Sequence, residues 1–263
     1  MLTFIGLGLG SEGLSLQGLR EARDSEAVYA ELYTSLLPGL EIAELERKIG
    51  KPIKRVSRRI VEENPGEILE AAKSRRVSFL VPGDPMVATT HVDLRLRAAR
   101  AGIETRIIHA ASIASAAAGL LGLQSYKFGP SATIPFPDNP STRPYEISAE
   151  NLKSGWHTML FLDLREGERA MTANEAIEIM FGLERRLGQA VFTSDRLLAV
   201  VARAGASDGF VRADRAESLH GEDFGAPPHL LVVPGRLHFI EAEALEVFAR
   251  APKEVVQWHM KRR

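Results

Sequence analysis

The sequence predicts an α/β protein built from two α/β domains, the first of which should hold a parallel, doubly wound sheet. Strand-like and helix-like stretches alternate through the first half of the chain, as is typical of a parallel sheet. Beyond residue 110 the pattern changes to small-residue and proline-rich segments. We therefore expect one domain over residues 1–110 and a second over residues 111–263, which is enough chain for two cores.

The first half contains five strand candidates that alternate with helices. The run from Leu2 to Leu9 is apolar and enters a glycine-rich turn, and Ser15 can cap the helix that follows. Further strands are predicted at Glu26–Tyr33, Pro52–Val56, Val77–Leu80 and Thr105–His109, with helices at Gly39–Gly50, around Glu67–Ser74 and from Thr89 to Arg100.

The second half opens with a small-residue helix over Ser112–Leu121, and its other elements are more widely spaced. Five prolines between Lys127 and Tyr145 predict an irregular connector or lid. Thr172 and Glu175 form a capping-box pattern that should open an amphipathic helix running to about Leu187. Strands are predicted at His157–Leu164, Leu197–Ala202, Phe210–Arg212 and Leu230–Val233, and a closing helix spans Leu237–Phe248.

The turn Gly83-Asp84-Pro85 is the strongest candidate for a ligand contact. It ends the buried run that starts at Val77, and it precedes a helix, which places it at the carboxyl edge of a parallel sheet. Ligands of open α/β sheets bind at that edge, so the carboxylate of Asp84 is a candidate ligand contact. The alternative is that Asp84 only caps its own turn.

The glycines after the first strand permit a second interpretation. Gly8, Gly10 and Gly13 have the spacing of a dinucleotide fingerprint, and Glu31 follows about 20 residues later, where such a site has its acidic residue. The helix appears only at Ser15, after the third glycine, which weakens the match. A nicotinamide-dependent oxidoreductase is therefore kept as an alternative.

Composition excludes several classes of function. The chain has no cysteine, and its seven histidines show no H-x-x-x-H spacing, so we expect no metal site. A net charge of −1 does not favour binding to nucleic acid or to a membrane surface. Because no run of about 18 apolar residues occurs, we expect a soluble, cytoplasmic protein.

Three features together carry a resemblance to a known family: FIGLGLG at residues 4–10, PGDPMVATTH at 82–91, and SIASA at 112–116. They resemble the tetrapyrrole methylase-like class of S-adenosylmethionine-dependent methyltransferases. Within that class the closer resemblance is to the diphthine synthases, which methylate a modified histidine on translation elongation factor 2. The segments that carry it are AELYTS (30–35), GDPMVATTHVDL (83–94), YKFG (126–129), MTANEA (171–176), ARAG (202–205) and EDFGAPPHLLVVPGRLHFIEAEAL (222–245).

The resemblance implies a homodimer whose cofactor, S-adenosylmethionine, is folded between the two domains and leaves as S-adenosylhomocysteine. The positions that it implies for cofactor contacts are Leu9, Asp84, Val87, Ser112, Ile113, Leu162, Ala204 and His229. The implied reaction transfers methyl groups, in three rounds, to the α-amino nitrogen of a 3-amino-3-carboxypropyl group on histidine. A tetrapyrrole methyltransferase of the precorrin type is the alternative within the class.

The final product of such a reaction is a fixed cation, which an aromatic face could stabilise. Tyr33, Tyr126 and Phe128 are the hypothetical candidates for that face. An α-amino group has a reference pKa of about 8, so a useful fraction is neutral without a strong protein base. The sequence nominates no catalytic base.

Overall fold

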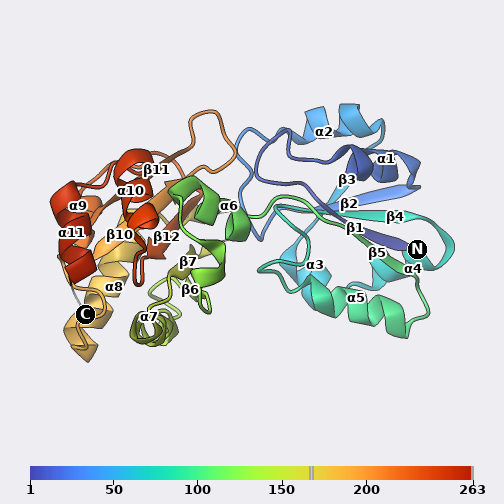
Figure 1. Ribbon diagram of the computed structural model, residues 1–263. Coiled ribbons are helices and arrows are strands. Elements are labelled where there is room, and N and C mark those ends of the chain that lie inside the picture. The colour runs from blue at the N-terminus through green and yellow to red at the C-terminus, as the bar shows by residue number, and fades with distance from the viewer. Residues whose placement is uncertain (166, 168, 262–263) are drawn as a thin grey trace. The chain divides into compact units, whose positions relative to one another are not determined.

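The computed structural model describes residues 1–165, 167 and 169–261 (Figure 1). The chain forms two compact units. Unit 1 comprises Met1–Ile113 with Leu164–Arg169, and unit 2 comprises Ala114–Asp163 with Ala170–Arg263. Each unit has its own five-stranded sheet, and β8 (Leu164–Arg165) pairs with β9 (Arg169–Ala170) in a small separate ribbon. The predicted α/β fold class with two sheets is confirmed.

The sheet of unit 1 is parallel throughout, with the strand order β3-β2-β4-β1-β5. Its strands are β1 (Leu2–Gly6), β2 (Ala27–Glu31), β3 (Ile53–Val56), β4 (Val77–Val81) and β5 (Thr105–Ile108). Its helices are α1 (Leu16–Asp24), α2 (Ile42–Ile49), α3 (Arg58–Glu62), α4 (Gly66–Ser74) and α5 (His91–Arg100). Each predicted strand of the first half is present, with ends shifted by a few residues.

Both faces of this sheet are covered by helices (Figure 1). Alternate side chains of β1 point to opposite faces: Phe4 packs with residues of α3, α4 and α5, whereas Ile5 packs with residues of α1 and α2. In β4, Phe79 likewise packs on the face of α3, α4 and α5, and Leu80 packs on the face of α1 and α2. This two-sided burial explains why these strands are continuous apolar runs rather than alternating ones.

The sheet of unit 2 has the order β11-β10-β12-β7-β6 and is mixed: β6 and β7 are parallel, and the remaining pairs are antiparallel. Its strands are β6 (Ala132–Ile134), β7 (Thr158–Leu162), β10 (Leu197–Ala202), β11 (Phe210–Arg215) and β12 (His229–Val233). Its helices are α6 (Ile113–Leu121), α7 (Arg143–Ser154), α8 (Ala173–Leu187), α9 (Ala216–His220), α10 (Phe239–Phe248) and α11 (Lys253–Lys261).

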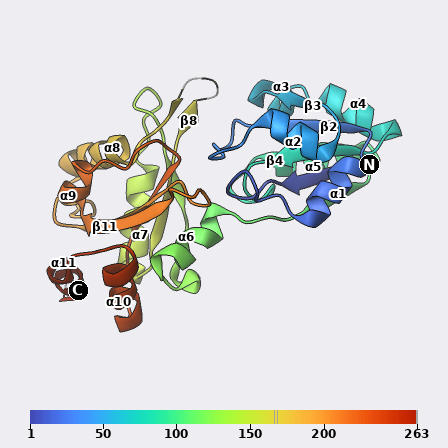
Figure 2. The ribbon, with the colours of Figure 1, turned by 90° about the horizontal axis from the view of Figure 1, so that it is seen from above.

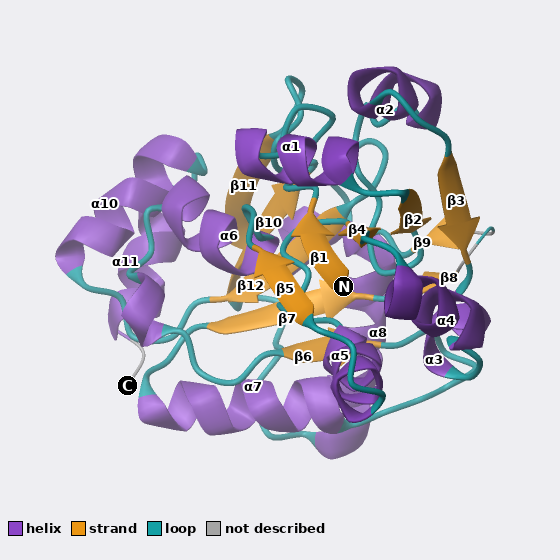
Figure 3. Ribbon diagram, turned by 90° about the vertical axis from the view of Figure 1, so that its right-hand side faces the viewer, coloured by secondary structure: helices purple, strands orange, loops and turns teal. Residues whose placement is uncertain are grey.

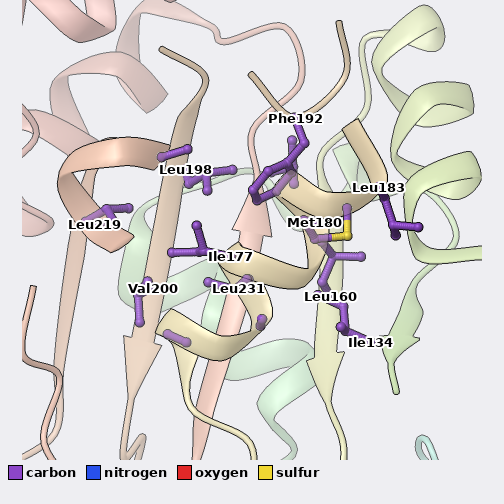
Figure 4. Packing of buried hydrophobic residues seen from close by; sticks show 14 of the residues in the cluster. Ile134, Leu160, Ile177, Met180, Leu183, Phe192, Leu198, Val200, Leu219 and Leu231 are labelled. Atoms are coloured by element: carbon purple, nitrogen blue, oxygen red, sulfur yellow. The ribbon is translucent and has the colours of Figure 1, made fainter. Parts of the chain in front are cut away.

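Helix α8 fills the core of unit 2. Its buried residues Ile177 and Met180 pack against side chains of β7, β10 and β12, among them Leu160 and Leu231 (Figure 4). The predicted capping box at its start is confirmed: the hydroxyl of Thr172 accepts from the amide of Glu175, and the Glu175 carboxylate accepts from the amide of Thr172. Helices α10 and α11 lie side by side at the C-terminal end of the chain (Figure 2).

The predicted connector or lid between Lys127 and Tyr145 is not irregular throughout. It contains β6, and helix α7 begins at Arg143, with Pro144 at its first turn, where the missing amide costs nothing. Phe136 and Tyr145 are fully buried in the core of unit 2. Much of this segment therefore serves as core, and its prolines mark turns between regular elements.

Candidate functional site

The ends of three parallel strands meet at one edge of the unit 1 sheet. β1 lies between β4 and β5 (Figure 3). All three strands run in the same direction, so the loops that follow them share the carboxyl edge. Leu9 lies in the loop after β1, Asp84 and Val87 lie in the turn after β4, and Ser112 and Ile113 follow β5. The structure therefore brings the predicted cofactor residues of unit 1 to the edge where such sheets bind ligands.

Gly6, the last residue of β1, allows the neighbouring loops to close over the end of its strand. A methyl group at Gly6 would lie 2.6 Å from the carbonyl oxygen of Gly83 and 2.7 Å from Cβ of Ala110, closer than real Cβ contacts. Just beyond, Gly8 and Gly83 exchange backbone hydrogen bonds of 3.1 and 2.8 Å. The turn after β4 and the end of β5 can meet across β1 because residue 6 has no side chain.

The glycine turn after β1 closes on itself. A Cβ at Gly8 would lie 2.7 Å from the carbonyl oxygen of Gly13, so the two glycines are needed for contact with each other. Helix α1 begins only at Leu16, where the Ser15 hydroxyl already accepts from the Gly18 amide. The turn therefore lacks the glycine-to-helix geometry with which a dinucleotide fingerprint holds a pyrophosphate.

Glu31 does not have the environment of a ribose-binding carboxylate either. It is fully buried, and one of its oxygens accepts from the amides of Tyr33 and Thr34 at 3.0 and 3.1 Å. Burial raises the pKa of Glu31 to about 7, even though these hydrogen bonds favour its charged form. A carboxyl group with no exposed surface cannot receive a ribose hydroxyl, so this geometry does not support the nicotinamide alternative.

The carboxylate of Asp84 fastens the turn after β4 to the end of β5. One oxygen accepts from the Met86 amide at 2.9 Å, which closes the turn. The other accepts from Nδ1 of His109 at 2.8 Å and from the Ala110 amide at 3.2 Å. Asp84 is only 5 % exposed, so its carboxylate serves contacts within the protein, and its contact with a cofactor stays a prediction.

The three predicted cofactor residues of unit 2 also share one sheet edge. Leu162 ends β7, Ala204 follows β10, and His229 opens β12. β12 is antiparallel to both neighbours, so its start lies beside their ends, and His229 stands opposite Ala202 of β10 in the register. Their role as cofactor contacts stays a prediction, but the strand order places all three at a common edge.

The imidazole of His229 is neutral, and one of its two nitrogens accepts a hydrogen bond from the backbone. Its Nδ1 accepts from the amide of Ala173 at 3.1 Å, so the ring proton resides on Nε2, and burial lowers the pKa of His229. The loop that leads to His229 is held by Arg203, whose guanidinium donates to the carbonyls of Phe224 and Ala226. Sequence reasoning missed Arg203, although it lies within the ARAG segment.

Two local features test whether the cofactor implied by the resemblance fits these edges. At Gly83, where φ is +67°, a Cβ would face open space, with its nearest neighbour, the Ala111 carbonyl oxygen, at 4.0 Å. Nε2 of His229 is buried and has no hydrogen-bond partner within the described part of the chain. Within unit 1, the open space at Gly83 and the exposed side chain of Val87 leave room for a ligand beside the turn after β4. Within unit 2, the buried Nε2 of His229 is a polar atom that a ligand could pair with.

The three hypothetical aromatic residues have different environments, each within its own unit, and their role as a face for the product cation stays a prediction. Tyr33 is buried, and the guanidinium of Arg58 lies 5.2 Å from its ring centroid, so that face already has a cation. Tyr126 is 79 % exposed, and Phe128 packs against His157 just before β7. The far end of β7 is about 16 Å away at 3.3 Å per residue, so Tyr126 and Phe128 lie at the opposite edge from the predicted cofactor residues of unit 2.

Within residues 1–165, 167 and 169–261, no group of three or more histidine, aspartate or glutamate side chains is placed to hold a metal ion. In the same residues, no helix has the length and apolar character needed to cross a membrane.

Comparisons with known proteins identify relatives over nearly the whole chain. Residues 1–220 match the family model of tetrapyrrole (corrin/porphyrin) methylases. The chain is 49 % identical to a diphthine synthase of Methanosarcina acetivorans over 98 % of this chain and 99 % of that protein. It is 46 % identical to a diphthine synthase of Methanothermobacter thermautotrophicus over 98 % of both. A crystal structure of diphthine synthase superposes with a TM-score of 0.90 at 42 % identity, covering 97 % of this chain and 98 % of that one.

Proposed function

This chain belongs to the tetrapyrrole methylase family and, within it, to the diphthine synthases, and on that premise we propose its substrate and the residues of its site. It is an S-adenosylmethionine-dependent methyltransferase. The proposed substrate is the 3-amino-3-carboxypropyl-histidine of translation elongation factor 2, methylated on its α-amino nitrogen to give diphthine. The observation that carries this proposal is similarity to diphthine synthases over nearly the full length, 98 % of this chain in sequence and 97 % in structure.

The residues proposed to hold the cofactor come from the two sheet edges described above. In unit 1 they are Leu9, Asp84, Val87, Ser112 and Ile113, and in unit 2 they are Leu162, Ala204 and His229. When bound, the cofactor supplies an activated methyl group on a good leaving group. The protein then has to hold the acceptor nitrogen in line with that methyl group, and positioning of this kind can supply much of the rate.

The proposed substrate also places the reaction in the cytoplasm, because elongation factors act there. A folded elongation factor must present one side-chain tip to these edges. We propose three rounds of methylation on the same nitrogen, which ends as a trimethylammonium group.

The proposal is tested by calorimetric titration followed by a methylation assay. We expect S-adenosylmethionine and S-adenosylhomocysteine to bind and a nicotinamide dinucleotide not to bind. Mass spectrometry of an archaeal elongation factor 2 that carries the aminocarboxypropyl histidine should then show added methyl groups. Methylation of a precorrin with no change in the elongation factor would instead favour the tetrapyrrole alternative, and absence of cofactor binding would overturn both.

We propose further that the protein is a homodimer and that helix α10 contributes to the contact between the two copies. Ala242 and Leu245 of this helix are buried against unit 2. Four other large apolar side chains of α10 are each more than half exposed: Phe239, Ile240, Val247 and Phe248. A helix that exposes several large apolar side chains opposite its buried face is normally covered there, and a second copy of the chain would cover these four.

Sedimentation velocity tests the dimer. The unaltered protein should sediment with twice the chain mass, and the double variant Phe239→Glu/Val247→Glu should shift towards the monomer at micromolar concentration. Leu16→Glu, which alters an exposed leucine of unit 1, is the matched control and should leave the mass unchanged. A monomeric unaltered protein would exclude the dimer, and a dimeric double variant would exclude α10 as the contact.

A further inference from the structure

The proposed reaction has a proton balance that the protein must meet. An α-ammonium group has no lone pair, so it loses one proton before each methyl transfer. In each round the nitrogen lone pair forms the bond to the methyl carbon, while the carbon–sulfur bond breaks and its electron pair goes to sulfur. Each further round requires removal of a proton from the newly methylated nitrogen. A side chain that accepts these protons at the site would therefore act in every round.

His109 has the placement that this task requires. It follows β5 directly, at the carboxyl edge that also carries Leu9, Val87, Ser112 and Ile113. Its side chain is 70 % exposed, so its free nitrogen can reach a substrate. We propose that His109 is the residue that accepts protons from the α-amino nitrogen of the substrate, an inference that rests on the proposed function.

Asp84 fixes the tautomer of His109. The Asp84 oxygen that lies 2.8 Å from Nδ1 of His109 also accepts the amide proton of Ala110, which identifies it as an acceptor. The proton of the imidazole therefore resides on Nδ1, and Nε2 carries the lone pair on the exposed side of the ring. A buried carboxylate that orients an imidazole in this way also stabilises the imidazolium formed when Nε2 takes up a proton.

The other histidines at the two edges lack this combination of exposure and a free lone pair. His91 of α5 is fully buried, and burial lowers its pKa to about 4. His229 already uses its Nδ1 lone pair to accept from the Ala173 amide. Asp84 is the charged group that contacts His109 among the described residues, so the proposed pair consists of these two side chains.

The test compares His109→Asn with His109→Ala. Asparagine can keep a donor where Nδ1 lies, and so can preserve the contact with Asp84, but it has no basic nitrogen. We expect both variants to bind S-adenosylhomocysteine in calorimetry within about twofold of the unaltered protein, while methyl transfer at neutral pH falls by about 100-fold, the typical contribution of a general base. The rate of both variants should rise with pH beyond the point where the unaltered enzyme levels off, and added imidazole should partly restore His109→Ala.

The outcomes separate this inference from the proposed function. If the unaltered protein methylates elongation factor 2 and His109→Asn retains both its rate and its pH profile, the proton-acceptor role is excluded. If His109→Asn is normal but His109→Ala loses cofactor affinity, His109 only positions Asp84, and the inference is likewise overturned. If the unaltered protein binds cofactor but does not modify the elongation factor, the proposed substrate fails, and calorimetry still reports whether the site is intact.

Discussion

Replacement of Glu241 by alanine is expected to destabilise unit 2 by about 3–5 kcal/mol, the cost typical of breaking a buried, charged hydrogen-bond network. Glu241 lies in the first turn of α10 and has no exposed surface. One of its oxygens accepts from the Gln124 amide and from Nε2 of His157, each at 2.9 Å. The other accepts from the His238 amide and forms an ion pair with Lys127. Four donors from separate segments would lose their acceptor at once.

Urea unfolding followed by tryptophan fluorescence measures this loss, because both tryptophans of the chain, Trp156 and Trp258, lie in unit 2. Glu243→Ala, an exposed glutamate of the same helix, is the matched control and should change the free energy of unfolding by less than about 0.5 kcal/mol. If Glu241→Ala lowers the free energy of unfolding by less than about 1 kcal/mol, this hydrogen-bond network is not needed for the stability of unit 2.

The same network predicts an acid dependence of stability. Burial alone would raise the pKa of Glu241, but hydrogen bonds from His238, Lys127 and Gln124 lower it to about 2, against 4.5 for an ordinary glutamate. A carboxyl group whose pKa is lower in the folded state stabilises the fold above pH 4.5, and this contribution is lost as the pH falls towards 2. At neutral pH this contribution of Glu241 to the free energy of unfolding amounts to about 3 kcal/mol. The difference in stability between the unaltered protein and Glu241→Gln should therefore shrink over that range.

Strands β1 and β4 could be predicted from the sequence because each is a short, mostly apolar run that a glycine or a proline closes. Helix α7 could not, because its inward face includes the polar residues Ser148 and Asn151, which break the apolar periodicity. Ser148 donates to the Pro144 carbonyl, and Asn151 donates to the Pro130 carbonyl and to the hydroxyl of Thr158. Contacts that satisfy buried polar groups in this way become visible only in three dimensions.

The same reasoning explains which parts of the candidate site were visible in the sequence. Asp84 stood out because a Gly-Asp-Pro turn after a buried strand marks a sheet edge. His109 did not, because its partner lies 25 residues away and the strands that carry the two residues are separated by β1. Their contact depends on the strand order and on the missing side chain of Gly6, which no local pattern records.

Replacement of Asp84 by alanine is expected to weaken S-adenosylhomocysteine binding by about 10- to 100-fold, or about 1.4–2.8 kcal/mol, because the hydrogen bonds that hold the turn after β4 in place would be lost. The Met86 amide, the Ala110 amide and Nδ1 of His109 would all lose their acceptor, and the turn after β4 would no longer be fastened to β5. The turn that carries Val87 would then be free to leave the geometry that binds the cofactor.

Calorimetry measures the affinity for S-adenosylhomocysteine of three variants: Asp84→Ala, Asp84→Asn and the control Asp93→Ala. The comparison separates this effect from a general loss of charge. Asp93 is an exposed carboxylate of α5 that pairs with Arg97, so its removal should leave the affinity unchanged. Asparagine keeps one accepting oxygen but can satisfy only one side of the network, so Asp84→Asn should lie between alanine and the unaltered protein. Thermal unfolding of each variant shows whether the fold is retained. If folded Asp84→Ala binds S-adenosylhomocysteine with undiminished affinity, the turn does not depend on its carboxylate, and the edge of unit 1 would have to hold the cofactor through its other loops.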